Sequence, residues 1–130
     1  MTESKLVSRE DIRRELILGA VDDVLPLAAV SSTVTQWNPS SSLAEIQNET
    51  LAVIRSLVSD GLFVLGAMTG EGRRWEPWNE PLEESMRKIA EVYLNRYDDP
   101  SAWIWYAWMK LTDEGRKAAQ ALQEGVADTR

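Results

Sequence analysis

Acidic side chains are the groups with the most obvious chemistry in this sequence, because the chain contains neither histidine nor cysteine. Without them the chain lacks the commonest general base, thiol nucleophiles and nitrogen or sulfur metal ligands. Pairs of neighbouring carboxylates remain, among them Asp22-Asp23, Glu83-Glu84 and Asp98-Asp99. Neighbours in sequence point in different directions on a helix, so these pairs do not predict shared acid–base work. We therefore expect no enzymatic activity, no metal site and no cofactor.

A second group of reactive or binding side chains lies in the segment TGEGRRWEPWNE, residues 69–80. Its glycines lack the GxxxxGK[ST] pattern and a following helix start, so they do not predict a phosphate-binding loop. The glycines and the proline predict an irregular loop around two arginines and two tryptophans. Aromatic residues and arginine dominate interface energetics, so the candidate partner contacts are Arg73, Arg74, Trp75 and Trp78. Alternatively, both indoles fold back over the helix at 81–97 or the strand at 103–111.

Three of the six tryptophans fall in WIWYAWMKL, residues 103–111, which predicts a strand. Both sides of this strand are apolar as far as Lys110, whereas a strand buried on one face alternates. The second side therefore needs cover, from the helix at 81–97 or from another molecule. Indoles can also stack on bases, but only Lys110 supplies the positive charge that such a platform needs. We expect core packing for Trp103, Trp105 and Trp108, and we expect Trp105 to be buried.

The charge of the chain limits its partners. Fourteen basic and 21 acidic residues give a net charge of −7, which repels polyanions and disfavours nucleic acid. This charge either keeps the protein soluble or attracts a basic partner. The chain has no cysteine, no secretory signal at its start and no apolar run near the roughly 18 residues of a membrane span. These features predict a cytoplasmic protein with no membrane association.

The apolar periodicity predicts a mostly helical α+β chain that forms a single domain over residues 1–130. Helices are expected from residue 9 to Pro26, over 27–36, 43–60 and 81–97, and from residue 113 onward. Extended segments are expected at 62–68 and 103–111, with frayed ends at 1–7 and 124–130. Ser42 and Glu45 predict a capping box for the third helix, and Gly61 predicts its left-handed C-cap. The predicted buried stripe of that helix is Leu43, Ile46, Val53, Ile54 and Leu57.

Two junctions between these elements resemble those of a known family. Residues 57–62 read L-x-x-x-G-L where a helix meets an extended segment, and residues 111–116 read LTxxGR where a strand meets the last helix. Residues 9–68 and 103–122 thus resemble a winged helix-turn-helix domain. The chain is also similar to small uncharacterised winged-helix-like proteins of actinobacteria. The resemblance implies three N-terminal helices, a small antiparallel hairpin with a helix inserted in an expanded wing at 69–102, a C-terminal helix, and the possibility of a homodimer.

The same resemblance implies that the helix at 43–60 is a recognition helix. Gln47 or Asn48 could read adenine there, with Arg55 as the helix's only basic residue. Base contacts need phosphate contacts to hold their register, and this helix supplies few. The first helix offers a basic stripe of Arg9, Arg13 and Arg14, which nearby acidic residues neutralise. The connection at 37–42 is also longer than the usual turn of 3–4 residues.

We therefore predict a non-enzymatic cytoplasmic protein that acts by protein–protein recognition. An immunity- or antitoxin-like protein that caps a basic toxin is one concrete form of this hypothesis. The alternative hypothesis is a DNA-binding transcriptional regulator whose basic surface is assembled in a dimer. The first hypothesis places function in the wing, and the second places it at Gln47, Asn48 and Arg55.

Overall fold

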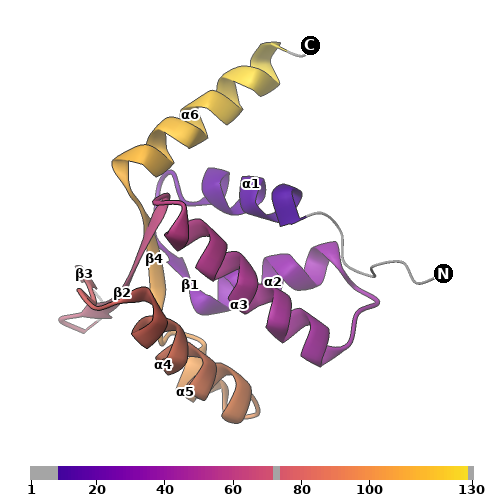
Figure 1. The fold of residues 1–130 in the computed structure, drawn as a ribbon, viewed down its shortest axis with the longest axis vertical. Helices are drawn as coiled ribbons and strands as arrows, with labels where there is room; N and C mark the ends of the chain where they lie inside the picture. Colours follow the sequence, from indigo (N-terminus) through magenta and orange to yellow (C-terminus); the bar gives the residue numbers. More distant parts are fainter. Residues whose placement is uncertain (1–8, 72–73, 129–130) are drawn as a thin grey trace.

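The computed structural model describes residues 9–71 and 74–128, and within them the protein is α+β (Figure 1). The helices are α1 (Arg9–Gly19), α2 (Leu27–Trp37), α3 (Leu43–Ser59), α4 (Leu82–Asn95), α5 (Pro100–Trp103) and α6 (Asp113–Asp128). The strands are β1 (Leu25–Pro26), β2 (Phe63–Thr69), β3 (Arg74–Pro77) and β4 (Trp108–Leu111). They form one antiparallel sheet in the order β1-β4-β2-β3. Among these helices, none has the length and apolar content to cross a membrane.

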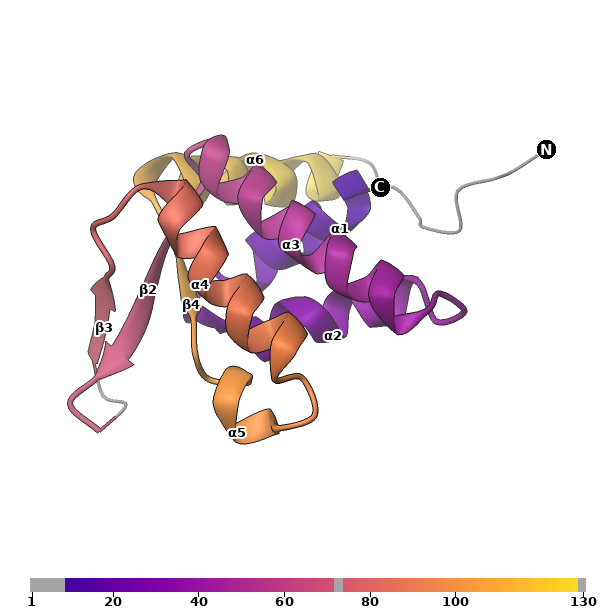
Figure 2. The ribbon, with the colours of Figure 1, turned by 60° about the horizontal axis from the view of Figure 1, so that its bottom comes forward.

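The core lies between the sheet and a bundle of α1, α2 and α3, with α4 packed along α3 (Figures 1 and 2). Residues opposite each other in an antiparallel pair share a face of the sheet. Phe63 pairs with Leu111 and Leu65 pairs with Met109, and all four side chains are buried against the bundle. This inner face therefore holds the apolar half of β2 and β4.

Helix α3 is the central element of the bundle and follows its sequence signals closely. The Ser42 hydroxyl accepts from the Glu45 amide, the Glu45 carboxylate accepts from the Ser42 amide, and Gly61 has a φ of 77°. Four members of the predicted stripe are buried: Ile46, Val53, Ile54 and Leu57. The prediction for Leu43 was wrong, since it is 48% exposed. Leu43 begins α3 at the end of the molecule away from the β2–β3 hairpin, beyond most of the core (Figure 2).

The region around Pro26 departs from the prediction. Helix α1 ends at Gly19 and not at Pro26, and Leu25–Pro26 forms β1 against β4. Aspartate side chains compete with helical hydrogen bonding, and here Asp23 accepts from the amide of Val24 at 2.8 Å. Helix α2 then begins directly after Pro26 and buries Leu27, Val30 and Val34 as expected.

The segment between β2 and β4 contains the other corrections. The predicted loop at 69–80 contains β3, which pairs with β2 across a turn where Gly70 and Glu71 have positive φ. The predicted strand at 103–111 is a strand only from Trp108 onward. Trp103, the first residue of the predicted strand, is instead the last residue of the short helix α5. It packs against Tyr93 and Tyr97, and its indole donates to the Tyr97 carbonyl at 2.9 Å.

The ends of the chain were expected to fray. Helix α6 spans Asp113–Asp128, so fraying within 124–128 stays a prediction, and the hydroxyl of Thr112 accepts from the amide of Gly115 in its first turn. The expectation for residues 1–7 lies outside the described residues, as do residues 129–130.

Two leucines of α3 provide a matched test of this packing. Leu57 is fully buried and Leu43 is half-exposed. We expect Leu57→Ala to lower the free energy of unfolding by roughly 2–5 kcal/mol, because it leaves a cavity. Leu43→Ala should change it by no more than about 1 kcal/mol. Urea unfolding followed by circular dichroism measures both, and equal losses would contradict the placement of α3.

Candidate protein-interaction surface

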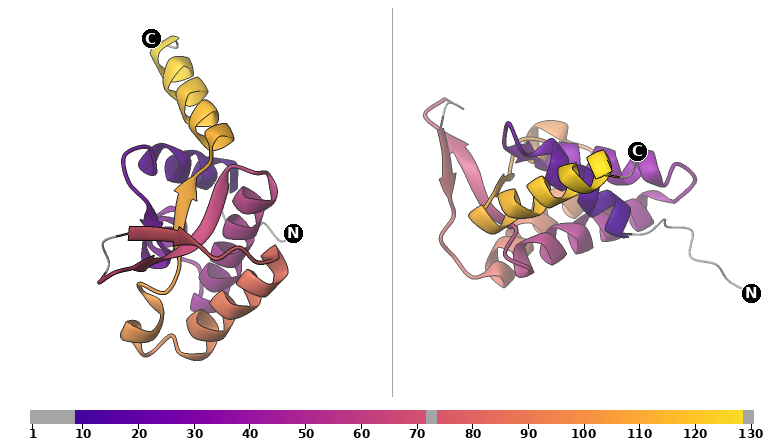
Figure 3. Two further views of the ribbon diagram at one scale, coloured as in Figure 1. Left: turned by 90° about the vertical axis from the view of Figure 1, so that its left-hand side faces the viewer. Right: turned by 90° about the horizontal axis from the view of Figure 1, so that it is seen from above.

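The face of the sheet that points away from the bundle is the candidate functional surface. Register and alternation place the following residues on it: Val64, Gly66, Met68, Trp75, Pro77, Trp108 and Lys110. Seen from this side, no helix of the described residues lies in front of β2, β3 and β4 (Figure 3, left). We call these residues, together with Trp105, the outer sheet face.

Trp75 lies flat across the outer sheet face because β2 has a glycine beneath it. A Cβ added to Gly66 would lie 2.8 Å from two ring atoms of Trp75 and 2.2 Å from the Glu76 carbonyl oxygen. The indole reaches across β2 to donate to the Trp108 carbonyl on β4, at 3.3 Å. The Lys110 ammonium lies 5.3 Å from the ring centroid, within the range of a cation–π contact.

Trp105 and Trp108 extend this surface beyond the start of β4. Their rings are stacked, with centroids 5.5 Å apart and an interplanar angle of 16°. The Trp108 indole is half-buried and donates to the Trp105 carbonyl at 3.1 Å. Trp105 is 63% exposed, which contradicts the prediction that it belongs to the core. The physical reason is that the chain turns at residues 104–106, so Trp105 does not share a strand face with Met109.

Of the four partner contacts predicted from sequence, the structure describes three, and these do not lie on one surface. Trp75 lies on the outer sheet face, whereas Trp78 folds back toward α4 and meets the Tyr106 ring edge-on at 5.7 Å. The Lys88 ammonium lies 4.1 Å from the Trp78 ring centroid. Arg74 is exposed and pairs with Glu76 at 3.3 Å. Arg73 lies outside the described residues.

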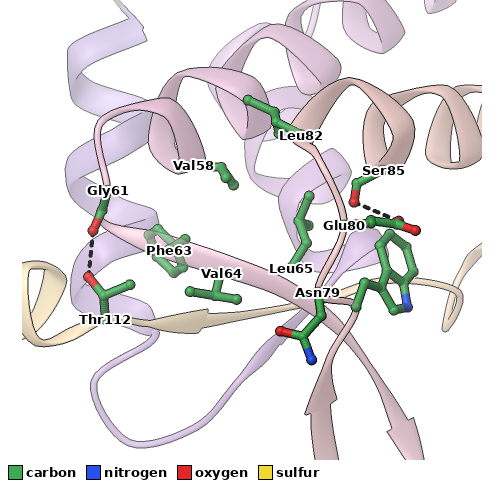
Figure 4. A pocket seen from close by; sticks show the side chains of 11 residues that line it. Val58, Gly61, Phe63, Val64, Leu65, Asn79, Glu80, Leu82, Ser85 and Thr112 are labelled. Carbon is green, nitrogen blue, oxygen red and sulfur yellow. Dashed lines mark hydrogen bonds between the residues drawn. The ribbon is translucent and has the colours of Figure 1, made fainter.

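A pocket of about 300 Å³ adjoins the outer sheet face, with Val64 belonging to both (Figure 4). It lies between the end of α3, the start of β2 and the segment leading into α4. Its polar groups include the carboxylate of Glu80, which accepts from the Ser85 hydroxyl at 2.7 Å and from the Lys88 ammonium. The hydrogen bond from Ser85, together with Lys88, holds the pKa of the Glu80 carboxyl below its ordinary value.

The three residues proposed for DNA reading are not presented together. The Gln47 side chain is buried and donates to the Tyr93 carbonyl at 3.3 Å, so it faces α4. Asn48 is exposed, and Arg55 is exposed but forms an ion pair with Glu83. Of these three residues, Gln47 is therefore withdrawn from solvent, and Arg55, the single basic residue of α3, is already paired.

The other charged candidates are also engaged within the fold. Of the basic stripe on α1, Arg9 binds the buried carboxylate of Glu49, Arg13 pairs with Asp60, and Arg14 pairs with Asp11. Three of the four carboxylates at 83–84 and 98–99 form ion pairs with arginines: Glu83–Arg55, Glu84–Arg87 and Asp99–Arg96. Across the described residues, no group of three or more acidic side chains is arranged to hold a metal ion.

Sequence reasoning missed Trp105, Trp108 and Lys110 as surface residues. A signal for them was present, because residues 104–108 are apolar on both sides of the expected strand. The second side needed cover, and the expected cover, the helix at 81–97, instead packs along α3. That side of the sheet is therefore the outer sheet face.

Comparisons with protein-family models, with curated proteins and with solved structures found no significant match. The functional assignment therefore rests on this chain's own residues.

Two tryptophans separated by one residue test the boundary between core and surface. Trp103 is 7% exposed and packs on two tyrosines, whereas Trp105 is 63% exposed. We expect Trp103→Ala to cost roughly 3–5 kcal/mol of stability. Trp105→Ala removes one exposed stack and should cost about 1 kcal/mol or less. Thermal unfolding of the two variants measures the difference, and a larger loss for Trp105→Ala would place that indole in the core.

Proposed function

We propose that this chain is a non-enzymatic, cytoplasmic, winged-helix-like protein that binds another protein through its outer sheet face. The observation that carries the proposal is the exposed, stacked pair Trp105–Trp108 beside Trp75, on a face without a covering helix among the described residues. Exposed apolar patches of this kind mark interaction sites. Tryptophan is also the residue type most enriched at the energetic centres of interfaces.

The charge of the chain supports a basic partner. The net charge of −7 attracts a positively charged protein over long range and speeds its approach. The indoles then supply the contact area at short range. A basic toxin held by an immunity- or antitoxin-like protein is one form that fits both properties.

The winged-helix-like assignment is supported by the order of the elements. Helix α3 ends in the L-x-x-x-G-L turn at 57–62 and leads into β2, and β4 ends in LTxxGR and leads into α6. Between the paired strands β2 and β4, the chain inserts β3, α4 and α5, as expected for an expanded wing. We infer that the insertion has moved recognition from α3 to the sheet.

The insertion also argues against DNA binding by α3, the alternative function. Helix α4 packs along α3 and takes the Gln47 amide out of reach of a groove. Of the three residues of α3 that were candidates for reading DNA, only Asn48 and the paired Arg55 are exposed. No observation in the described residues favours this alternative.

The protein-binding proposal is tested by exchanging exposed indoles. Tagged wild-type protein, Trp105→Ala and Trp37→Ala are used to capture partners from the native host, followed by mass spectrometry. Trp37 is the control, since it is also exposed, at 37%, but lies at the end of α2 away from the sheet and donates to Glu15. We expect one protein to be captured by the wild type and by Trp37→Ala. Trp105→Ala should weaken its affinity about 30-fold, as calorimetry with the purified partner measures. Equal affinity for all three proteins would overturn the proposal.

The DNA alternative has its own measurement. In a selection from random duplexes at physiological salt, we expect no sequence to bind more tightly than the nonspecific range of about 10⁻⁴–10⁻⁶ M. A single enriched motif bound at nanomolar strength, and lost on Asn48→Ala with Arg55→Ala, would establish the alternative instead.

A further inference from the structure

The pocket beside the outer sheet face combines an apolar wall with one charged group (Figure 4). Its wall consists of Val58, Phe63, Val64, Leu65 and Leu82. Among its lining residues in the described part of the chain, Glu80 alone carries a charge. A long side chain with an apolar stem and a positive head would match this division, because such side chains bury their stems and keep their heads among polar groups.

The Glu80 carboxylate has acceptor capacity left for such a head group. One of its oxygens, Oε2, receives the Ser85 hydroxyl at 2.7 Å and the Lys88 ammonium at 3.0 Å. The other, Oε1, receives only Lys88 among the residues that the structure describes, at 3.2 Å. A carboxylate offers about four lone-pair positions, so one position on Oε1 stays open. The hydrogen bond from Ser85 and the charge of Lys88 keep the pKa low and the group ionised at neutral pH.

Two neighbours of Glu80 add recognition elements. Asn79 is exposed, lines the pocket, and has a φ of 54°, a left-handed conformation that non-glycine residues adopt rarely. Within the described residues its side-chain amide has no hydrogen bond, so its oxygen can accept one. The Trp78 indole also lines the pocket and already attracts the Lys88 ammonium to its ring. These groups accept hydrogen bonds or attract cations.

We propose that this pocket receives an arginine side chain of the protein partner that lies on the outer sheet face. This inference rests on the proposed function and names the chemistry of the partner. The five donors of a guanidinium can serve the Glu80 and Asn79 oxygens together, with its methylenes against Val64 and Leu82. A carboxylate ligand would instead meet the charge of Glu80, and the net charge of −7 would repel it.

The test uses N-acetyl-arginine amide as the probe, titrated into the whole protein and followed by nuclear magnetic resonance. We expect saturable shifts at the Trp78 indole N–H and the Asn79 side-chain amide, with a Kd in the millimolar range suited to one side chain. Glu80→Gln should weaken binding about tenfold, because it replaces the charged acceptor of the guanidinium with a neutral amide of the same shape. Glu84→Gln is the matched control, since Glu84 is exposed, lies in the first turn of α4 four residues after Glu80, and does not line the pocket. It should bind like the wild type.

Other outcomes would overturn the inference. N-acetyl-citrulline amide has the same shape without the charge, and equal binding would show that the pocket does not recognise a cation. Tighter binding of N-acetyl-glutamate amide than of the arginine probe would also overturn the inference. So would the absence of shifts at Trp78 and Asn79 when the arginine probe is added. If Glu80→Gln fails to fold, Asn79→Gly takes its place, because it removes the side-chain amide while glycine readily adopts the positive φ of this position, and it should weaken the probe. Partner capture that depends on Trp105 while the probe does not bind would leave the proposed function standing and remove only this inference.

Discussion

The burial of α3 is the packing arrangement on which the rest of the structure depends. This helix contacts α1, α2, α4 and β2, and its buried residues Val53, Ile54 and Leu57 are all but inaccessible to solvent. Polar residues also connect α3 to its neighbours: the Thr50 hydroxyl accepts a hydrogen bond from the Tyr93 hydroxyl on α4, and the Tyr93 hydroxyl is hydrogen-bonded to the Ser31 hydroxyl on α2. Because α3 is held on so many sides, each neighbouring element takes its position from it.

This arrangement also decides which surfaces stay open. The inserted helix α4 lies along α3 and so cannot cover the sheet. The sheet carries apolar residues on both faces, but the helices of the described residues cover only one of them. Strand β2 buries Phe63 and Leu65 on the covered face and presents Val64 on the other. Helix α3, expected from sequence to be a recognition helix, is packed into the core through its buried residues, and the indoles of the sheet are the accessible group. The pocket at Glu80 lies beside the sheet, where the chain passes from β3 into α4.

The features predicted correctly from sequence are those encoded by neighbouring residues. The capping box of Ser42 and Glu45, the C-cap at Gly61 and most of the α3 stripe involve contacts within one or two helical turns. The helical α+β class followed from the same periodicity.

The remainder depended on contacts between distant residues. Trp103 and Trp105 are chemically identical, but Trp103 packs on the rings of Tyr93 and Tyr97, whereas the turn at residues 104–106 leaves Trp105 exposed. Gln47 looks like a reading residue until its amide meets a carbonyl 46 positions away. The short strands β1 and β3 contain two and four residues, too few to show a period, and exist through their pairing with β4 and β2.

The composition of these two short strands has a consequence for how the sheet meets other molecules. They form its two edges, and each contains a proline, Pro26 in β1 and Pro77 in β3. Proline has no amide hydrogen to offer a neighbouring strand, and β3 also bears the charged residues Arg74 and Glu76. Such edges resist the addition of further strands, so the sheet can display its tryptophans without templating growth into a larger sheet. Molecules that dock on this protein must therefore recognise its side chains and not extend its backbone ladder.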